Sequence, residues 1–260
     1  MTGPPDALVT SIVGGPSLVT DLWWFDRCDS TNAEALRAAS DGAAEGLLVV
    51  ADEQTAGRGR HGRTWVAPPG SSLLWSLLLR PAVPAPQRRL LPLLTGLVVA
   101  EVVARHVPEA AVSVKWPNDV LVDQAKVAGI LAEATGDAVV VGVGVNVDWR
   151  GVPRPDELGN ATSVAEAAGR DIDRWRLLAG LVGMVSQRYE HWRDTPAGFL
   201  DDYRRRCSTI GARVAVTGLD GAVMQGEAAH IDDEGALVLR TAGGVATVTA
   251  GDVQHIRGEG

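Results

Sequence analysis

Three consecutive strand-like segments in the middle of the chain constrain its fold more than any other feature. The segments "AVSVKWPNDVLV" (111–122), "KVAGILAEAT" (126–135) and "AVVVGVGVNVDW" (138–149) are rich in β-branched residues, which predicts consecutive strands of one sheet. The preceding stretch, 90–107, is apolar nearly all round and ends in Arg105 and His106, as a buried helix with cations near its C-terminus would. Adjacent strands covered by a core helix are typical of an α+β domain.

The flanking segments predict the rest of the domain organisation. Strands are expected at 22–27, 46–54 and 71–81, a helix capped by Ser30 or Thr31, and further helices at about 171–192 and 196–206. Residues 208–260 consist of short strand-like runs broken by Gly and Asp, which predicts a small, barrel-like all-β module. Residues 1–20 are rich in Gly, Pro and small residues, and we expect at most one short helical turn there. We therefore expect a flexible N-terminal arm (1–20), a main domain (21–207) and a C-terminal module (208–260).

Composition excludes two classes of protein. No apolar run approaches the roughly 20 residues of a membrane span, which argues against a transmembrane protein. The net charge of -8 argues against a broad nucleic-acid-binding surface, which needs clustered Lys and Arg. Cys28 and Cys207 show no metal-ligand spacing, and the first residues lack the order of a signal peptide, so we expect a cytoplasmic protein.

The stretch "GRGRHGR" (57–63) concentrates three arginines in this acidic chain. Its glycines permit close backbone approach, and Arg58, Arg60 and Arg63 offer planar forks that suit carboxylate or phosphate. One interpretation is a solvated loop that touches RNA or nothing. The other is a lid that becomes ordered when an anion balances the mutually repelling arginines. Trp65, at the far end, is either a core anchor or a platform for a flat ring.

Three further strings carry candidate binding residues. "KWPNDV" (115–120) is either a simple hairpin corner or a site that Asn118 and Asp119 face, with charge supplied by Lys115. Strand alternation places Lys126 on the face of Ala128 and Ile130, where it heads a small apolar row and is expected to face an anion.

The string "GVGVNV" (142–147) fits neither the dinucleotide fingerprint nor the P-loop. Its glycines admit either a ligand, with Asn146 available to bond a base or ribose, or a closely packed protein element.

Together the strings resemble one family. Five strings occur in the order found in the biotin protein ligases, and the resemblance runs from residue 22 to the C-terminus. The strings are "STN" (30–32), "EQTAGRGRHGRTW" (53–65), "KWPNDV", "KVAGILAE" (126–133) and "GVGVNV". It implies a mixed, mainly antiparallel sheet with helices packed on it, similar to class II aminoacyl-tRNA synthetases, followed by a small SH3-like β-barrel. It also implies a reaction in which biotin and ATP, with Mg²⁺, give biotinyl-5'-AMP, from which biotin passes to a carrier lysine.

The resemblance implies residue roles as well. The expected biotin-binding residues are Ser30, Thr31, Asn32, Gln54, Gly57, Arg58, Arg60, Lys126 and Gly129. The expected ATP or adenylate contacts are Arg60, Arg63, Trp65, Lys115, Asn118, Lys126 and Asn146. The expected catalytic residues are Lys126, Arg58, Arg60, Arg63 and Asp119, where Asp119 orients Lys126, helps Mg²⁺ or assists deprotonation of the amine. A second loop, 149–160, is expected to fold over the nucleotide, and both loops are expected to be poorly ordered without ligand. Metal ligands stay unassigned.

The implied partner is the biotin carboxyl carrier domain of an acyl-CoA or pyruvate carboxylase. Bifunctional family members carry an N-terminal helix-turn-helix, for which residues 1–20 leave no room, so we expect a monofunctional enzyme that binds no nucleic acid. The oligomeric state is open. Two alternatives are a lipoate or octanoate ligase on the same scaffold and a non-catalytic biotin sensor. The GRGRHGR and KWPND strings argue against the first, and Lys126 with the loop arginines argues against the second.

Overall fold

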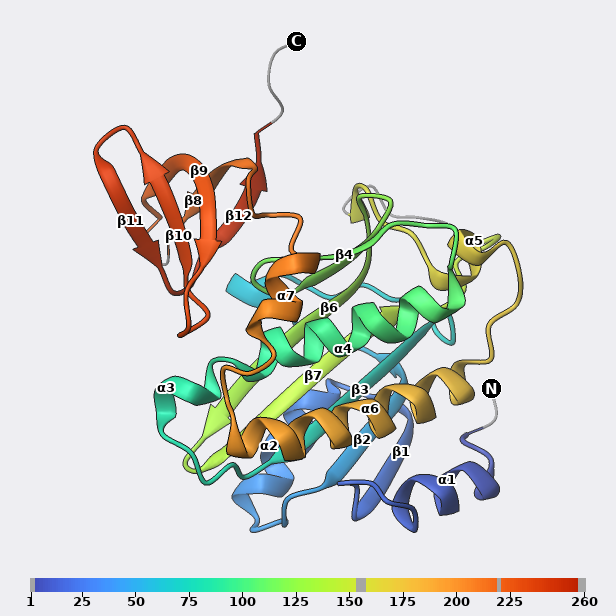
Figure 1. Cartoon of the computed structure of the whole chain (residues 1–260). Coiled ribbons are helices and arrows are strands. Elements are labelled where there is room, and N and C mark those ends of the chain that lie inside the picture. Colours follow the sequence, from blue (N-terminus) through green and yellow to red (C-terminus); the bar gives the residue numbers. More distant parts are fainter. Residues whose placement is uncertain (1–2, 153–157, 219–220, 257–260) are drawn as a thin grey trace.

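A seven-stranded mixed sheet organises the main part of the chain in the computed structural model, which describes residues 3–152, 158–218 and 221–256 (Figure 1). The strand order is β1-β2-β3-β7-β6-β5-β4, and every neighbouring pair is antiparallel except β1 and β2. The strands are β1 (Asp21–Cys28), β2 (Leu47–Gln54), β3 (Ser72–Leu79), β4 (Val112–Lys115), β5 (Asp119–Val122), β6 (Ala125–Thr135) and β7 (Ala138–Asn146). The prediction that the strands within 111–149 are neighbours in one sheet is confirmed.

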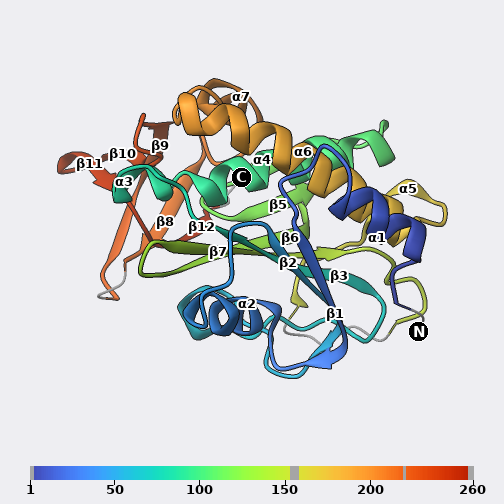
Figure 2. The ribbon, with the colours of Figure 1, turned by 90° about the horizontal axis from the view of Figure 1, so that it is seen from below.

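Helices cover both faces of this sheet, but most lie on one (Figure 2). The helices are α1 (Asp6–Val13), α2 (Thr31–Ser40), α3 (Ala85–Arg88), α4 (Leu91–His106), α5 (Val164–Ala168), α6 (Arg174–Asp194) and α7 (Leu200–Arg206). Helix α4 packs on the sheet with one side and against α6 and α7 with the other. This double coverage explains why its sequence is apolar nearly all round, and the predicted core helix is confirmed.

Helix α2 lies alone on the opposite face of the sheet (Figure 2). Its inner side is made of the alanines Ala35, Ala38 and Ala39, which pack against β2, β3 and β7. Small side chains let the helix approach the sheet closely. Ser30 is the N-cap residue, yet its side chain makes no capping hydrogen bond, so the predicted capping interaction is absent there. The close packing places the start of α2 beside the strands.

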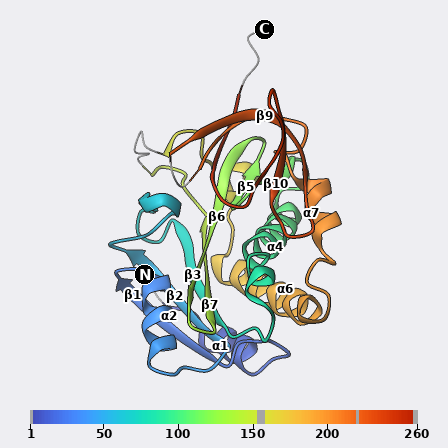
Figure 3. The same cartoon turned by 90° about the vertical axis from the view of Figure 1, so that its left-hand side faces the viewer.

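The C-terminal part forms a separate antiparallel sheet with the order β11-β10-β9-β8-β12. Its strands are β8 (Arg213–Thr217), β9 (Val223–Ile231), β10 (Leu237–Thr241), β11 (Gly244–Val248) and β12 (Asp252–His255). This sheet sits at one end of the main sheet (Figure 3), where Trp116 Nε1 donates to Gly235 O at 2.9 Å. The α+β fold class with a C-terminal β module is confirmed.

The N-terminal segment differs from the loosely held arm expected from the sequence. Within the described residues 3–20, α1 spans eight residues and packs against α6 and β1. Ile12 and Val19 are buried, and Leu18 N donates to Ser186 Oγ at 3.0 Å. The burial of these residues could not be predicted from the sequence, because they are few and are spaced among Gly, Pro and small polar residues.

None of the described helices combines the length and the apolar character needed to cross a bilayer. Helix α6 has 21 residues, but charged side chains are spread along it.

Candidate active site

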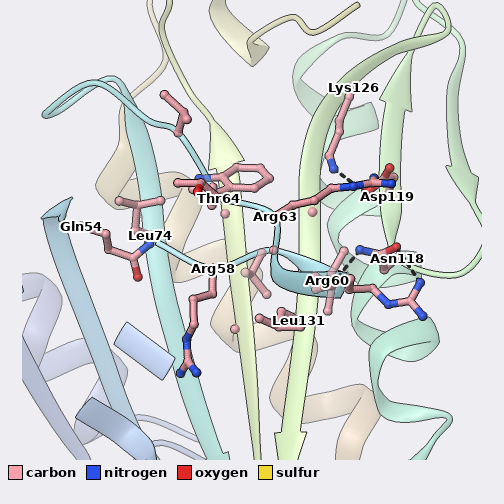
Figure 4. A pocket seen from close by; sticks show the side chains of 18 of the residues that line it. Gln54, Arg58, Arg60, Arg63, Thr64, Leu74, Asn118, Asp119, Lys126 and Leu131 are labelled. Carbon is pink, nitrogen blue, oxygen red and sulfur yellow. Dashed lines mark hydrogen bonds and ion pairs between the residues drawn. The ribbon is translucent and has the colours of Figure 1, made fainter. Parts of the chain in front are cut away.

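A pocket of about 250 Å³ lies where β3, β6 and β7 meet the start of α2, the arginine loop (residues 57–63) and β12 (Figure 4). Most residues with expected roles line it: Ser30, Thr31, Asn32, Gln54, Arg58, Arg60, Arg63, Trp65, Asn118, Asp119, Lys126, Gly129 and Asn146. Gly57 and Lys115 do not. A Cβ atom on Gly57 would contact the backbone oxygen of Trp65 and the side chain of Gln54. The positive charge of Lys115 helps to lower the pKa of Asp252, on β12. The fold thus gathers residues from strings up to 116 positions apart, from Ser30 to Asn146.

One end of the pocket is polar and buried. Ser30, Thr31 and Asn32 are each 4% exposed, and with Gln54 they form what we call the buried end. Thr31 donates to Gln54 Oε1 from its backbone N at 2.7 Å and from its hydroxyl at 3.0 Å. Ser76, in the middle of β3, lies 2.8 Å from the Thr31 hydroxyl and donates to Asn32 Oδ1 at 2.6 Å. Buried polar groups held this firmly keep a fixed arrangement of donors and acceptors for a ligand.

Asn32 packs directly against Gly142, where only glycine leaves enough space for the Asn32 side chain. A Cβ atom on Gly142 would lie 1.9 Å from Asn32 Oδ1, well inside contact distance. The Asn32 amide donates from Nδ2 to Leu131 O at 3.1 Å and to Glu133 Oε2 at 2.8 Å. Gly142 therefore admits a protein side chain, one of the two interpretations that the glycines of "GVGVNV" left open.

Trp65 covers two further glycines. Cβ atoms on Gly129 and Gly144 would lie 2.8 Å and 2.5 Å from its indole ring. Lys126 Nζ lies 5.4 Å from the ring centroid, within the range of a cation–π contact. The indole Nε1 is buried and makes no hydrogen bond to any described residue. Trp65 thus forms part of the pocket wall in this structure and presents an unsatisfied donor there.

Lys126 points into the pocket because of a β-bulge. The register between β5 and β6 shifts at this point, so that Val127 is an extra residue. As a result, Lys126 Nζ lies 3.3 Å from where a Gly129 Cβ would be, on the pocket face, whereas Ala128 and Ile130 belong to the core. The expectation that Lys126 shares a face with Ala128 and Ile130 is therefore wrong. Regular alternation cannot reveal a bulge.

The carboxylate nearest to Lys126 is that of Asp119, with 2.6 Å between Nζ and Oδ1. Asp119 begins β5 and pairs with Gly129 across the sheet, which brings it to the same wall (Figure 4). The "KWPNDV" string is therefore both a hairpin corner and part of the site, since the turn between β4 and β5 also carries Asn118.

The three loop arginines point in different directions (Figure 4). Arg58 Nη1 lies 3.1 Å from Glu133 Oε1. Arg60 Nη1 donates to Gly251 O at 3.0 Å and to Asn118 Oδ1 at 3.4 Å, and burial lowers the pKa of its guanidinium.

Arg63 donates to the carboxylate of Asp252, the first residue of β12. Burial favours the neutral carboxyl, but the hydrogen bond from Arg63 and nearby positive charges outweigh it, so the pKa of Asp252 lies below its ordinary value. The C-terminal module thus contributes two oxygen partners to the arginine loop.

Asn146 and the second loop lie on the far side of the pocket. Asn146 Nδ2 donates to Thr162 O at 2.9 Å, while its Oδ1 is buried without a hydrogen-bond partner among the described residues. Trp149 Nε1 donates to Ser72 Oγ at 3.2 Å. Residues 153–157 of the predicted second loop lie outside the described residues, and the predicted ligand-dependent order of both loops stays a prediction.

Three residues that hold side chains of the site through hydrogen bonds or ion pairs were not predicted to have a role there. Ser76 left a signal, since it is a lone polar residue within the apolar run "LLWSLLL" of β3. Glu133 was only part of a longer string. Asp252 gave no signal in the sequence, because it reaches the site from the C-terminal module.

The two cysteines lie outside the pocket lining, and both are buried free thiols. Burial raises the pKa of Cys28 to about 12 and also raises that of Cys207. Neither thiol is suited to act as a nucleophile near neutral pH.

The arrangement suits a ligand with a polar, uncharged head and an anionic end. The buried end supplies donors and acceptors without net charge, whereas Lys126, Arg60 and Arg63 supply positive charge further out. Cations around a small, partly enclosed pocket stabilise negative charge that develops during a reaction.

Comparisons with known proteins agree with this geometry. The description "Biotin/lipoate A/B protein ligase family" matches residues 24–148, and "Biotin protein ligase C terminal domain" matches residues 209–256. A biotin–[acetyl-CoA-carboxylase] ligase of Mycobacterium tuberculosis is 42% identical over 256 residues, which cover 96% of this chain and 95% of that protein. A bifunctional ligase/repressor of Bacillus subtilis is 36% identical over 90% of this chain and 73% of that protein. A solved biotin protein ligase of Aquifex aeolicus, in complex with biotin and ATP, matches with a TM-score of 0.78 at 30% identity over 92% of this chain and 99% of that one. The chain belongs to the biotin protein ligase family.

Proposed function

We propose that this protein joins biotin to ATP, giving biotinyl-5'-AMP and pyrophosphate, and then transfers the biotinyl group to a lysine of a carrier domain. The observation that carries the proposal is the combination of a buried, uncharged polar end with Lys126 and the loop arginines in one pocket. The Aquifex aeolicus relative with the same fold binds both biotin and ATP.

The buried end is the proposed site of the biotin head group. The ureido ring offers two N–H donors and one carbonyl acceptor, and Ser30, Thr31 and Gln54 carry hydroxyl and amide groups that match both. The valeryl chain then runs along the wall formed by Trp65 and Gly129. Its carboxylate ends near Lys126.

The first step forms one bond and breaks another. A biotin carboxylate oxygen attacks the α-phosphorus of ATP, and the bond from that phosphorus to the bridging oxygen breaks as pyrophosphate leaves. Both reactants are anions, so Lys126, Arg60 and Arg63 are proposed to hold them together by neutralising charge. The arginine loop and Trp65 are proposed to keep water from the mixed anhydride.

The second step moves the acyl group. The carrier lysine, as a neutral amine, attacks the acyl carbon, and AMP leaves with the electron pair of the broken C–O bond. Because the amine must lose a proton, a nearby carboxylate helps, and Asp119 lines the pocket. Its contact with Lys126 favours orientation of that lysine as its main role.

Mg²⁺ is proposed to enter with the ATP phosphates and to neutralise part of their charge. No group of three or more His, Cys, Asp or Glu in the described part of the chain is arranged to hold a metal ion. Mg²⁺ often uses only one or two carboxylates together with phosphate oxygens. Asp119 and Asp252 are two carboxylates that line the pocket, so the donor set fits this mode.

The proposed partner is the biotin carrier domain of an acyl-CoA or pyruvate carboxylase, since two relatives are named for acetyl-CoA carboxylase. We propose a cytoplasmic location and no nucleic-acid partner. We also propose that residues 21–207 act as the catalytic domain and 208–260 as an SH3-like module that supports it.

Mass spectrometry of a carrier domain tests the transfer step. We expect a purified acetyl-CoA carboxylase carrier domain to gain one biotinyl group in the presence of biotin and MgATP. A carrier whose acceptor lysine is replaced by arginine should gain none. Modification of both carriers to the same extent would contradict enzyme-directed transfer to that lysine.

A further inference from the structure

Glu133, on β6, connects two parts of the site. Its Oε2 accepts a hydrogen bond from Asn32 Nδ2 at 2.8 Å, and its Oε1 lies 3.1 Å from Arg58 Nη1. Asn32 belongs to the buried end, and Arg58 belongs to the arginine loop. Each oxygen of one carboxylate therefore holds a different part of the pocket.

The Asn32 side of this connection is rigid. Asn32 accepts from Ser76 at 2.6 Å, donates to Leu131 O at 3.1 Å, and packs against Gly142, where an added Cβ would lie 1.9 Å from its Oδ1. Ser76 in turn contacts the Thr31 hydroxyl at 2.8 Å. Thr31 donates to Gln54 Oε1 through its backbone N–H at 2.7 Å, so an unbroken series of close polar contacts runs from Gln54 to Glu133.

The Arg58 side chain has few other contacts among the described residues. The Arg58 side chain is 44% exposed, and Glu133 is its one ion-pair partner within the described residues. The backbone of Arg58 pairs with the other arm of the same loop, through the bridge between Arg58 and Thr64. The position of the Arg58 side chain thus depends on Glu133.

We propose that Glu133 is a positioning residue that couples occupancy of the buried end to the placement of Arg58. This inference rests on the proposed function, since the occupant of the buried end is the biotin head group. Asn32 fixes the Glu133 carboxylate beside the buried end, and Glu133 holds Arg58 and the start of the arginine loop over the pocket, so a head group bonded to Thr31 and Gln54 favours this placement of Arg58. Biotin in the buried end thereby stabilises the placement of Arg58 that Glu133 provides.

The carboxylate is needed because both of its neighbours are donors. Glutamine at this position has the same shape but only one acceptor oxygen, and its NH₂ group would face either Asn32 Nδ2 or Arg58 Nη1. One of the two contacts must therefore break in Glu133→Gln. Since the pair is partly exposed, its loss has little effect on the stability of the fold.

The test compares Glu133→Gln with Glu53→Gln. Glu53 is a matched control because it is also partly exposed, 31% against 26%, and pairs with one arginine, Arg27, at 3.3 Å, while lying outside the pocket lining. Three quantities are measured: the rate of biotin-dependent ATP–pyrophosphate exchange, the melting temperature, and the rate at which trypsin cleaves after the loop arginines with and without biotin.

We expect biotin to slow loop cleavage in the wild type and in Glu53→Gln but not in Glu133→Gln. The exchange kcat of Glu133→Gln should fall about tenfold, since misplaced groups cost rate, while its KM for biotin changes less than about threefold. Its melting temperature should shift by less than about 3 °C. Because Glu133 acts through Arg58, adding Glu133→Gln to Arg58→Ala should slow exchange no further.

Two results would overturn the role of Glu133. One is unchanged loop protection and exchange in Glu133→Gln. The other is a parallel loss of melting temperature, biotin affinity and exchange, which would make Glu133 structural. A wild-type protein with no biotin-dependent exchange would instead refute the proposed function, so the two failures are distinguishable.

Discussion

The ammonium group of Lys126 lies 2.6 Å from Asp119 Oδ1, on the pocket wall formed by β5 and β6. The bulge at Val127 turns Lys126 toward this carboxylate, and Asp119 is fixed by its pairing with Gly129. A lysine held in this way is oriented before any ligand arrives. Under the proposed function, a biotin carboxylate or an α-phosphate would meet a cation that is already in place.

Replacement of Lys126 tests this arrangement. We expect Lys126→Gln to fold with a near-native melting curve and to lower biotin-dependent pyrophosphate exchange by about a hundredfold or more, since a preorganised charge is lost from the reacting atoms. Arg176→Gln is the control, because Arg176 is an exposed cation on α6 that does not line the pocket. An equal loss in both variants would contradict the placement of Lys126 at the reacting centre.

The close packing of Asn32 against Gly142 gives a second prediction. A methyl group in Gly142→Ala would overlap Asn32, so Asn32 must move, at a cost of about 1–3 kcal/mol in the free energy of unfolding. We expect the KM for biotin to rise about tenfold or more, since the buried end loses its geometry. Gly183→Ala, in α6, serves as control because a Cβ there meets no atom within 4 Å. Unchanged biotin affinity in Gly142→Ala would contradict the assignment of the buried end.

Arg60 tests the arginine loop. Arg60→Ala removes the contacts to Gly251 O and Asn118, and we expect it to fold normally yet to lose adenylate formation or to release biotinyl-AMP into solution. Chromatography of the reaction mixture detects free adenylate. Arg176→Ala, whose side chain is 87% exposed on α6, should behave as wild type. Full activity without leakage in Arg60→Ala would remove this arginine from the mechanism.

The contact between Arg63 and Asp252 predicts a pH dependence. Because the folded pKa of Asp252 is depressed, its contribution to stability is complete above the ordinary aspartate pKa of about 3.9 and disappears as the pH falls through the folded value. Urea unfolding of the wild type and Asp252→Asn should differ by at most about 1 kcal/mol at pH 7. The difference should shrink toward zero in acid, down to the lowest pH at which the wild type stays folded. A difference that persists or grows in acid would contradict the ion pair.

Much of the fold was predictable because its elements have strong local patterns. The apolar helix α4 and the β-branched strands β6 and β7 were found within a few residues of their observed ends. The segment 111–122, read as one strand-like segment, contains two strands, β4 and β5. The anchoring of helix α1 was not predicted, because it depends on two buried residues, Ile12 and Val19, and on packing against α6, which is far away in the sequence.

The site was predicted less completely, for three physical reasons. The side-chain direction of Lys126 depends on a bulge, which follows from strand pairing rather than from local sequence. The glycines Gly142 and Gly144 indicated close approach, but the partners that fill the space, Asn32 and Trp65, come from distant strings. Asp252 enters from a different module altogether.

The most direct test of the central claim is the release of pyrophosphate from MgATP by the purified protein, measured in parallel with biotin, lipoate and octanoate. We predict release with biotin alone, because the pocket pairs a buried polar end with cations at the reacting centre. Release with lipoate or octanoate in place of biotin, or no release with any of the three despite biotin binding, would contradict a biotin protein ligase activity for this chain.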